Sequence, residues 1–256
     1  MTTRDEPWPA GTPCWVDYGA VDVDAAATFY SEVLGWTPET SGPEYGGYVM
    51  CKVGDRDAAG IGPNTTPGTP SAWMTYISSS DADATVVAAT EAGGMVLAPP
   101  FDVMDLGRMA VVADPQGAVF GVWQAISHIG SSVVNEPGGL TWNEAAVADP
   151  QAAKAFYTQV FGYRFEATPG GGERYSTFSV DGERALGGLG GLPAEGVSPH
   201  WLTYFSVADT DATVTAARER GASFEAGPFD TEFGRMATLT DPWGATFAVM
   251  GGGTAA

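Results

Sequence analysis

Two short aromatic–acidic pairs stand at matching points of the chain. Trp15 is followed two residues later by Asp17, and Trp142 is followed two residues later by Glu144. On a strand, residues two apart point to the same face, so each pair sets an indole beside a carboxylate. A partly buried carboxylate can act as a general acid or base. An ionised carboxylate can instead bind a cationic or hydroxyl-bearing ligand while the indole stacks on it. We therefore take Asp17 and Glu144 as candidate acid–base residues; core tryptophans beside surface acids are the plain alternative.

Further aromatic and basic side chains also recur in pairs. Two Trp-x-Thr-Tyr segments add aromatic surface, and an arginine follows a glycine in each half. Arginine can hold a carboxylate or carbonyl ligand bidentately, but it can equally pair with a neighbouring acid such as Asp105 or Glu232. The candidate ligand-binding residues are Trp15, Trp142, Trp73, Tyr76, Trp201, Tyr204, Arg108 and Arg235.

The supply of metal-binding side chains is poor. The chain has two histidines, His128 and His200, and two cysteines, Cys14 and Cys51. A catalytic metal normally takes three protein ligands, and these four residues show no ligand spacing. We expect His128 to be a solvated loop residue and the thiols to be buried and idle. The sequence therefore predicts no metal and no cofactor.

The candidate residues belong to a unit that occurs twice, with an offset of 127 residues (142 minus 15). In the first copy, a strand over 14–20 precedes a helix that Asp22 caps and Gly35 ends. In the second copy, Asp149-Pro150 and Gly162 mark the same helix. Each half closes on an Asp-Pro-x-Gly segment, at 114–117 and 241–244, which predicts a type I turn between two strands. A repeat this long, present twice, indicates a tandem domain duplication.

The length of 256 residues fits two domains of roughly 125 residues each. We predict domain 1 over residues 1–124, a linker over 125–139 and domain 2 over 140–256. Each domain reads as two βαβββ modules, because the strand–helix–strand pattern restarts near Trp73 and near Trp201. A crossing helix covers one face of a sheet, which leaves the other face free to curve into a cup.

Charge narrows the choice of partners. The net charge is −20, from 31 acids and 11 bases. Nucleic acids and anionic membrane surfaces require clustered Lys and Arg, so we expect neither as a partner. The acids are scattered, which favours solubility over a specific role, although they would also attract cationic small molecules. The N-terminal residues 1–13 lack an apolar signal region, so we expect a cytoplasmic protein.

The repeated Asp-x-x-x-Ala-x-x-Phe-Tyr helix pattern, the closing Asp-Pro-x-Gly turns and the count of four modules resemble the vicinal oxygen chelate superfamily. This is the glyoxalase, bleomycin-resistance and dioxygenase group, and tandem glyoxalase-like proteins of actinomycetes are the most similar type. The resemblance implies an α+β fold of two tandem domains, each with two βαβββ modules forming a concave mixed sheet with helices on the outer face. It also implies sites inside the cups and an internal pseudo-dimer of the two halves, compatible with a monomer.

The same resemblance implies where metal ligands would lie, and this chain departs from it there. The positions where relatives carry His, Gln or Glu are Trp15, Trp142, Met74, Leu202, Gly60, Gly188, Gly121 and Ala248. None of these side chains binds a divalent cation.

We therefore predict metal-independent binding of a bulky, partly aromatic small molecule, of the kind met in secondary metabolism or resistance. The protein would either sequester this ligand or act on it by acid–base chemistry, and the sequence leaves open whether it is an enzyme. The first alternative is a metal-dependent glyoxalase or dioxygenase with unusual ligands. The second is a protein-interaction module with vestigial cups.

Overall fold

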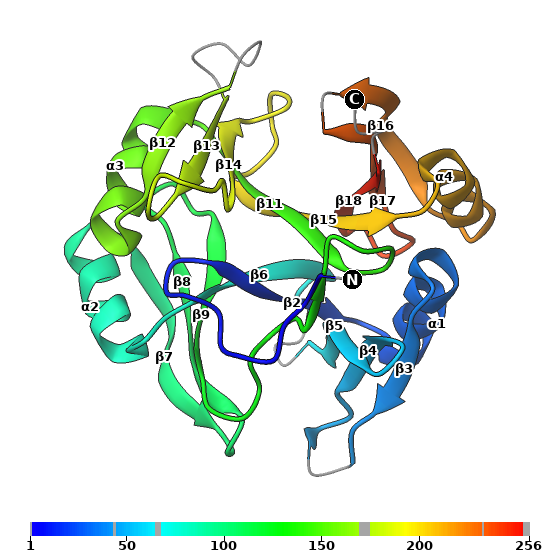
Figure 1. Cartoon of the computed structure of the whole chain (residues 1–256), viewed down its shortest axis with the longest axis horizontal. Coiled ribbons are helices and arrows are strands. Elements are labelled where there is room, and N and C mark those ends of the chain that lie inside the picture. Colours follow the sequence, from blue (N-terminus) through cyan, green and yellow to red (C-terminus); the bar gives the residue numbers. More distant parts are fainter. Residues whose placement is uncertain (1, 43–44, 65–67, 169–174, 232, 253–256) are drawn as a thin grey trace.

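The chain forms two curved mixed sheets, one from each half of the sequence, in a computed structural model (Figure 1). The structure describes residues 2–42, 45–64, 68–168, 175–231 and 233–252. Within that part, no helix is long and apolar enough to cross a membrane. The repeated architecture confirms the predicted tandem α+β fold.

The first half contributes β1 (Thr2–Thr3), β2 (Pro13–Ala20), α1 (Val23–Leu34), β3 (Thr37–Thr40), β4 (Val49–Val53), β5 (Arg56–Pro63), β6 (Ala72–Ser78), α2 (Ala82–Glu91), β7 (Met95–Val103), β8 (Gly107–Ala113) and β9 (Val119–Ala125). The second contributes β10 (Val133–Val134), β11 (Leu140–Val147), α3 (Pro150–Phe161), β12 (Arg164–Ala167), β13 (Tyr175–Ser179), β14 (Gly187–Gly191), β15 (His200–Val207), α4 (Thr210–Glu219), β16 (Ser223–Thr231), β17 (Gly234–Thr240) and β18 (Thr246–Gly252).

Strand order is the same in both halves. The first sheet runs β3-β4-β5-β2-β6-β9-β8-β7, and the second runs β12-β13-β14-β11-β15-β18-β17-β16. Each sheet joins two βαβββ modules through its central antiparallel pair, β2 with β6 or β11 with β15. The short strands β1 and β10 extend the second sheet beside β11.

The helix boundaries follow the local signals in the sequence. The Asp22 carboxylate accepts the backbone N–H of Ala25 at 3.0 Å, and Gly35 ends α1 in the left-handed region with φ of 74°. Asp149 and Gly162 cap α3 in the same way. These contacts satisfy backbone groups at the helix ends that have no partner within the helix. Because the capping residues are local in sequence, the helix boundaries could be predicted from it.

Strands were predicted less completely than helices. Strand β7 runs from Met95 to Val103 through Pro99 and Pro100, which are unfavourable residues for a strand, and has two register shifts against β8. Proline is tolerated there because β7 is an edge strand, where a missing N–H breaks few ladder bonds. The short edge strand β3 was not predicted from the sequence, and all four of its residues are exposed.

The two halves pack through their helix-bearing faces, as an internal pseudo-dimer. Helix α1 contacts α4 and α2 contacts α3, while β6 and β15 pass each other at the centre. Two hydrophobic cores result, and each contains residues from both halves. The concave faces consequently open toward opposite sides of the molecule (Figure 1).

Buried hydrogen bonds join the halves at two equivalent places. The Trp73 indole donates to the hydroxyl of Tyr30 at 2.9 Å, and that hydroxyl donates to the Asp241 carboxylate of the other half at 2.8 Å. The Tyr18 hydroxyl also donates to Asp241. The equivalent relay is Trp201 to Tyr157 to Asp114, at 3.0 and 3.2 Å. We call these two sets the interdomain relays.

The aspartates of the relays are those of the predicted Asp-Pro-x-Gly turns. One carboxylate oxygen of Asp241 accepts the backbone N–H groups of Trp243 and Ala245, at 2.9 and 2.8 Å, which confirms the turn. The other oxygen receives the phenols from the opposite half. One side chain therefore closes a hairpin and fastens the two halves together.

We expect Tyr30→Phe to destabilise the protein by about 1–3 kcal/mol, because it leaves the buried Trp73 N–H without its acceptor and Asp241 without one donor. Urea unfolding measures this directly. Tyr45→Phe is the control, since Tyr45 is 39 % exposed. Equal unfolding midpoints for the two variants would contradict the role given to the relay.

Candidate functional site

The concave face of the first sheet, called cup 1, centres on the Asp17 carboxylate. Asp17 accepts the indole N–H of Trp15 at 2.7 Å and the hydroxyl of Tyr48, and Tyr76 is a third hydrogen-bond partner. Burial raises the pKa of Asp17, and the three donors lower it in part. The predicted pairing of Trp15 with Asp17 is thus present, and a set of phenols completes it.

The concave face of the second sheet, called cup 2, repeats the arrangement around Glu144. The two carboxylate oxygens of Glu144 accept hydroxyls from Tyr175 at 3.0 Å and Tyr204 at 2.8 Å. The Trp142 indole donates to the Tyr175 hydroxyl at 3.1 Å instead of reaching the carboxylate. Burial raises the pKa of Glu144, and both phenols lower it in part.

Sequence reasoning missed Tyr48 and Tyr175, although the repeat contained the signal. Their positions differ by 127, the same offset that relates Trp15 to Trp142. Each phenol lies over a glycine: a Cβ at Gly60 would stand 1.7 Å from the Tyr48 oxygen, and one at Gly188 would stand 2.0 Å from the Tyr175 oxygen. The glycines noted above as unfit metal ligands therefore make room for a phenol.

Cup 1 is packed with the protein's own side chains. Trp15 is 3 % exposed and Trp123 is 6 % exposed, and the segment after β9 lies against both of them. The His128 ring contacts the Trp15 ring edge-on, with centroids 4.6 Å apart, and its carbonyl accepts the Trp123 indole N–H at 2.9 Å. Met50, Met74 and Met109 pack against the same cluster.

The expectation of a solvated His128 was wrong. Burial lowers the pKa of His128, and its Nε2 atom is buried with no hydrogen-bond partner among the described residues. The polar composition of the linker gave no sign of this, because the burial comes from tryptophans far away in the sequence. His200 lies at the start of β15, and its Nδ1 atom is 2.8 Å from the carbonyl of Ser198.

Cup 2, in contrast, holds a cavity of about 810 Å³. Its lining includes Trp142, Glu144, Tyr175 and Tyr204, with Met236 and Met250 on the strands of the last module. Residues of the N-terminal arm and of the segment before β11 form another part of its wall. Pockets for small organic ligands usually measure about 300–1,000 Å³, so the cavity is large enough for a polycyclic molecule.

Two predicted aromatic residues lie on the other face of their strands. Trp73 and Trp201 are three residues from Tyr76 and Tyr204, so they point away from the cups. Trp73 packs with Tyr30 and with Phe205 in the core, at centroid distances of 5.0 Å. The structure brings Tyr76 and Tyr204 to the carboxylates and places Trp73 and Trp201 in the interdomain relays.

Arg108 is not brought to a cup carboxylate. Its guanidinium binds Asp83 at 2.6 Å and Asp102 at 2.7 Å, which ties the first turn of α2 to the edge strand β7. The neighbouring acid considered from the sequence was Asp105, so the partner in the structure is a different one. The pairs lie at the surface and contribute little to stability individually.

Arg235 repeats this arrangement in the second half. It binds Asp211 at 2.5 Å and Asp230 at 3.1 Å, so it ties α4 to β16. The acid considered from the sequence, Glu232, lies outside the described residues. Both arginines therefore brace a helix against an edge strand, and neither lines the cavity of cup 2.

The cups fit a divalent metal poorly. Within the described residues, no three His, Cys, Asp or Glu side chains come together as a ligand set. The phenols beside Asp17 and Glu144 are poor substitutes, because burial raises the pKa of each and keeps it protonated as a hydrogen-bond donor. Each cup thus supplies one carboxylate where a catalytic metal normally takes three ligands.

The model of the Glyoxalase/Bleomycin resistance protein/Dioxygenase superfamily matches residues 15–122 and again 125–249. The chain belongs to this superfamily. The two matches follow the duplication, and the predicted family is confirmed.

Members of the superfamily resemble this chain along nearly its whole length. CFP32 of Mycobacterium tuberculosis, provisionally named a glyoxylase, is 40% identical over 257 residues, which cover 98% of each chain. The anthracycline biosynthesis protein DnrV of Streptomyces peucetius is 38% identical over 256 residues, covering 94% of this chain and 93% of its own.

Solved structures of the superfamily share the fold at low sequence identity. The Mn(II)-bound glyoxalase of Novosphingobium aromaticivorans has a TM-score of 0.65 at 15% identity and covers 94% of this chain and 82% of its own. The 2,3-dioxygenase LapB of a Pseudomonas species has a TM-score of 0.65 at 15% identity, covering 95% and 93%. These superfamily structures support the arrangement of modules and sheets.

We expect Asp17→Asn to become more stable relative to the unmodified protein as pH rises. The pKa of Asp17 is raised in the folded state above its usual 3.8. Asp17 therefore contributes its full stabilisation of the folded state below pH 3.8, and this stabilisation is lost as the pH rises through the folded-state pKa. Each unit of elevation corresponds to about 1.4 kcal/mol. Urea unfolding of both proteins over a pH series measures the difference, and a pH-independent difference would count against a raised pKa of Asp17.

Proposed function

We propose that cup 2 binds a bulky, partly aromatic small molecule without a metal, and that Glu144 is its principal polar contact. The observation that carries the proposal is the cavity of about 810 Å³ that opens onto Glu144, where the matching face of cup 1 is packed. The half-buried Trp142 offers an indole face to an aromatic ring, and Met236 and Met250 offer adaptable apolar contacts.

Polar groups around the cavity define what the ligand carries. Each oxygen of Glu144 accepts one phenol and keeps a second acceptor site, which suits a hydroxyl on the ligand. The Thr168 hydroxyl lines the same cavity, is buried and lacks a partner among the described residues. Buried hydroxyls are normally hydrogen-bonded, so Thr168 supports a ligand with a further polar substituent.

Arg4 and Arg184 also line the cavity. The Arg4 guanidinium lies over the Trp8 ring at 4.6 Å and donates to two backbone carbonyls, while Arg184 is exposed and has no ion pair with any described residue. An arginine at this place suits a carbonyl or an acidic group. We therefore favour a hydroxylated polycyclic compound with carbonyl groups.

The relatives support a role in secondary metabolism. DnrV and the similar DauV are named anthracycline biosynthesis proteins, so binding of a hydroxylated polycyclic product or intermediate agrees with their names. Two uses of such a site remain in our proposal: sequestration of the compound, or acid–base chemistry by Glu144. Asp17 has the equivalent chemistry but lies in the packed cup, so we assign it a structural part.

We expect Glu144→Gln to weaken binding of quinizarin, a dihydroxyanthraquinone, by roughly tenfold, because a hydrogen bond to a charged acceptor is replaced by a neutral one. Isothermal titration calorimetry measures the dissociation constants at neutral pH.

The duplication supplies a matched control, Asp17→Asn, which makes the same change in cup 1 and should leave the affinity unaltered. Trp142→Phe and Trp15→Phe form a second matched pair with the same expectation. Equal weakening by both members of a pair, or no binding of quinizarin and related polycyclic phenols, would overturn the assignment to cup 2.

A metal-dependent glyoxalase or dioxygenase with unusual ligands is the competing function. We expect elemental analysis of the purified protein to find Ni, Zn, Mn and Fe well below one atom per chain, because the described residues of neither cup offer a ligand set. The most demanding test uses protein from cells grown in metal-supplemented medium, because a metal site would then be filled. One bound transition-metal atom per chain after dialysis would decide for the metal enzyme.

A further inference from the structure

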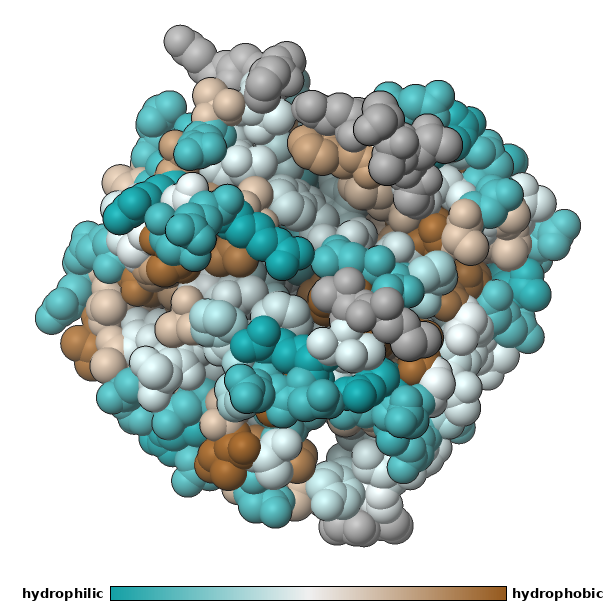
Figure 2. Space-filling model, in the orientation of Figure 1, coloured by the Kyte–Doolittle hydropathy of each residue, from teal (hydrophilic) through white to brown (hydrophobic). Residues whose placement is uncertain are grey.

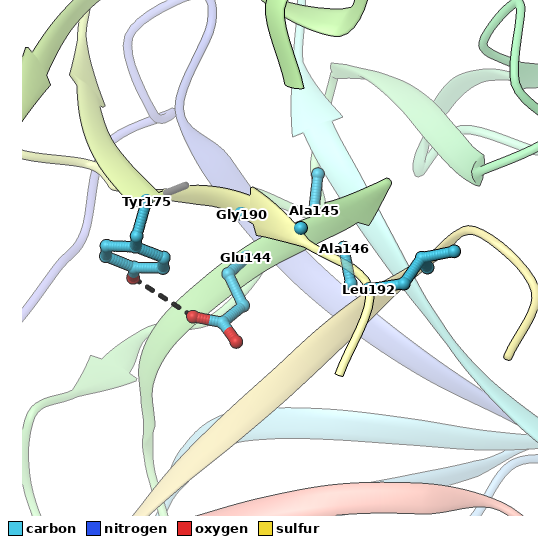
Figure 3. A pocket seen from close by; sticks show the side chains of 7 residues that line it. Glu144, Ala145, Ala146, Tyr175, Gly190 and Leu192 are labelled. Carbon is cyan, nitrogen blue, oxygen red and sulfur yellow. Dashed lines mark hydrogen bonds between the residues drawn. The ribbon is translucent and has the colours of Figure 1, made fainter. Parts of the chain in front are cut away.

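A second, smaller cavity lies on the far side of Glu144. It measures about 180 Å³ and is lined by Glu144, Ala145, Ala146, Tyr175, Gly190, Gly191 and Leu192. On β11, residues Leu140 to Glu144 line the large cavity, and residues Glu144 to Ala146 line the small one. Glu144 and Tyr175 line both cavities, so this pair lies between them. The hydrogen bond that joins the two side chains is drawn in Figure 3.

The corresponding place in cup 1 is filled. Gly19 and Ala146 occupy equivalent positions in the two cups. Gly19 of β2 pairs with Gly62 of β5, and Ala146 of β11 pairs with Gly190 of the equivalent strand β14. The Asn64 side chain covers Gly19, with its Oδ1 atom 2.5 Å from where a Cβ would stand. The residue at the equivalent point of cup 2 is Leu192, which borders the small cavity. The hollow is therefore a property of the half that also has the large cavity.

The small cavity is suited to water. Its volume corresponds to several water molecules, each of which takes about 30 Å³ in the liquid. Among the described residues on its wall, the polar side chains are the carboxylate of Glu144 and the hydroxyl of Tyr175, and the others are alanine, glycine and leucine. A bulky ligand in the large cavity would cover Glu144 from one side only.

We propose that the small cavity gives solvent its own route to the Glu144 carboxylate, so that this group exchanges protons with bulk water while a ligand fills the large cavity. The inference rests on the proposed function, since it requires a ligand in cup 2. A ligand hydroxyl that loses its proton forms the O–H bond of Glu144. That proton then passes to water in the small cavity and on to the buffer, which restores the carboxylate.

The test is a stopped-flow pH jump on the quinizarin complex, followed by the visible absorbance of the bound quinizarin. The unmodified protein should show a phase faster than quinizarin dissociation, whose rate constant is measured separately by displacement. Residue 146 points to the same face of the strand as Glu144, so the leucine side chain of Ala146→Leu would occupy the small cavity. This variant should lose the fast phase and relax only at the dissociation rate. Ala146→Val serves where the leucine prevents folding.

Two further variants make the result specific. Leu192→Ala widens the small cavity and should keep the fast phase, whereas Glu144→Gln should lose it because the titrating group is gone. Relaxation limited by dissociation in the unmodified protein, or a fast phase retained by Ala146→Leu, would overturn the solvent route and leave the binding site intact. Failure of quinizarin to bind would overturn the binding site and the route together.

Discussion

The arrangement of this molecule depends on two buried aspartates that receive phenolic hydroxyls from the opposite half. Asp114 and Asp241 each use one carboxylate oxygen to close a turn and the other to accept from Tyr157 or Tyr30. A buried carboxylate without donors is costly, so the halves must meet where these phenols lie. Because those phenols are on the helix-bearing side, the convex faces meet and the concave faces point away from the contact between the halves. The face seen in Figure 2 carries many hydrophilic residues around its rim, with neutral and hydrophobic ones between them.

The same chemistry recurs inside the cups with a different outcome. Asp17 and Glu144 are both strand carboxylates held by phenols, and in each cup a glycine makes room for one phenol. Glu144 accepts from Tyr175 and Tyr204 as Asp17 accepts from Tyr48 and Tyr76, but the Trp142 indole donates to Tyr175 and not to the carboxylate. In cup 1 the Trp15 indole donates to the Asp17 carboxylate itself, and the segment after β9 covers this face through His128. One ancestral arrangement thus became a packed core in one half and an open site in the other.

Much of the fold could be predicted because its signals are local or repeated. The helix caps are set by Asp22, Gly35 and their counterparts, and the duplication fixed the number of modules. The pairing of Trp15 with Asp17 followed from strand alternation, and the same rule, applied to Trp73 and Tyr76, would have separated them. Tyr48 was missed because the residues around it differ from those around Tyr175, so no shared motif marks the pair. The burial of His128 depends on long-range packing against Trp15 and Trp123, which no local pattern encodes.

The sealing of cup 1 has a consequence for how the two halves are connected. Backbone N–H groups at Ser131 and Ser132 donate to Cys14 and Asp57, and Trp8 donates to the Ser131 carbonyl. Up to Ser132 the connector is thereby a structural part of the first half, and its length cannot be changed freely. A gene split between the halves would have to leave the stretch up to Ser132 on the N-terminal fragment and the rest on the C-terminal one, where Val134 pairs with Leu140 and Gly138 donates to the Ser206 carbonyl.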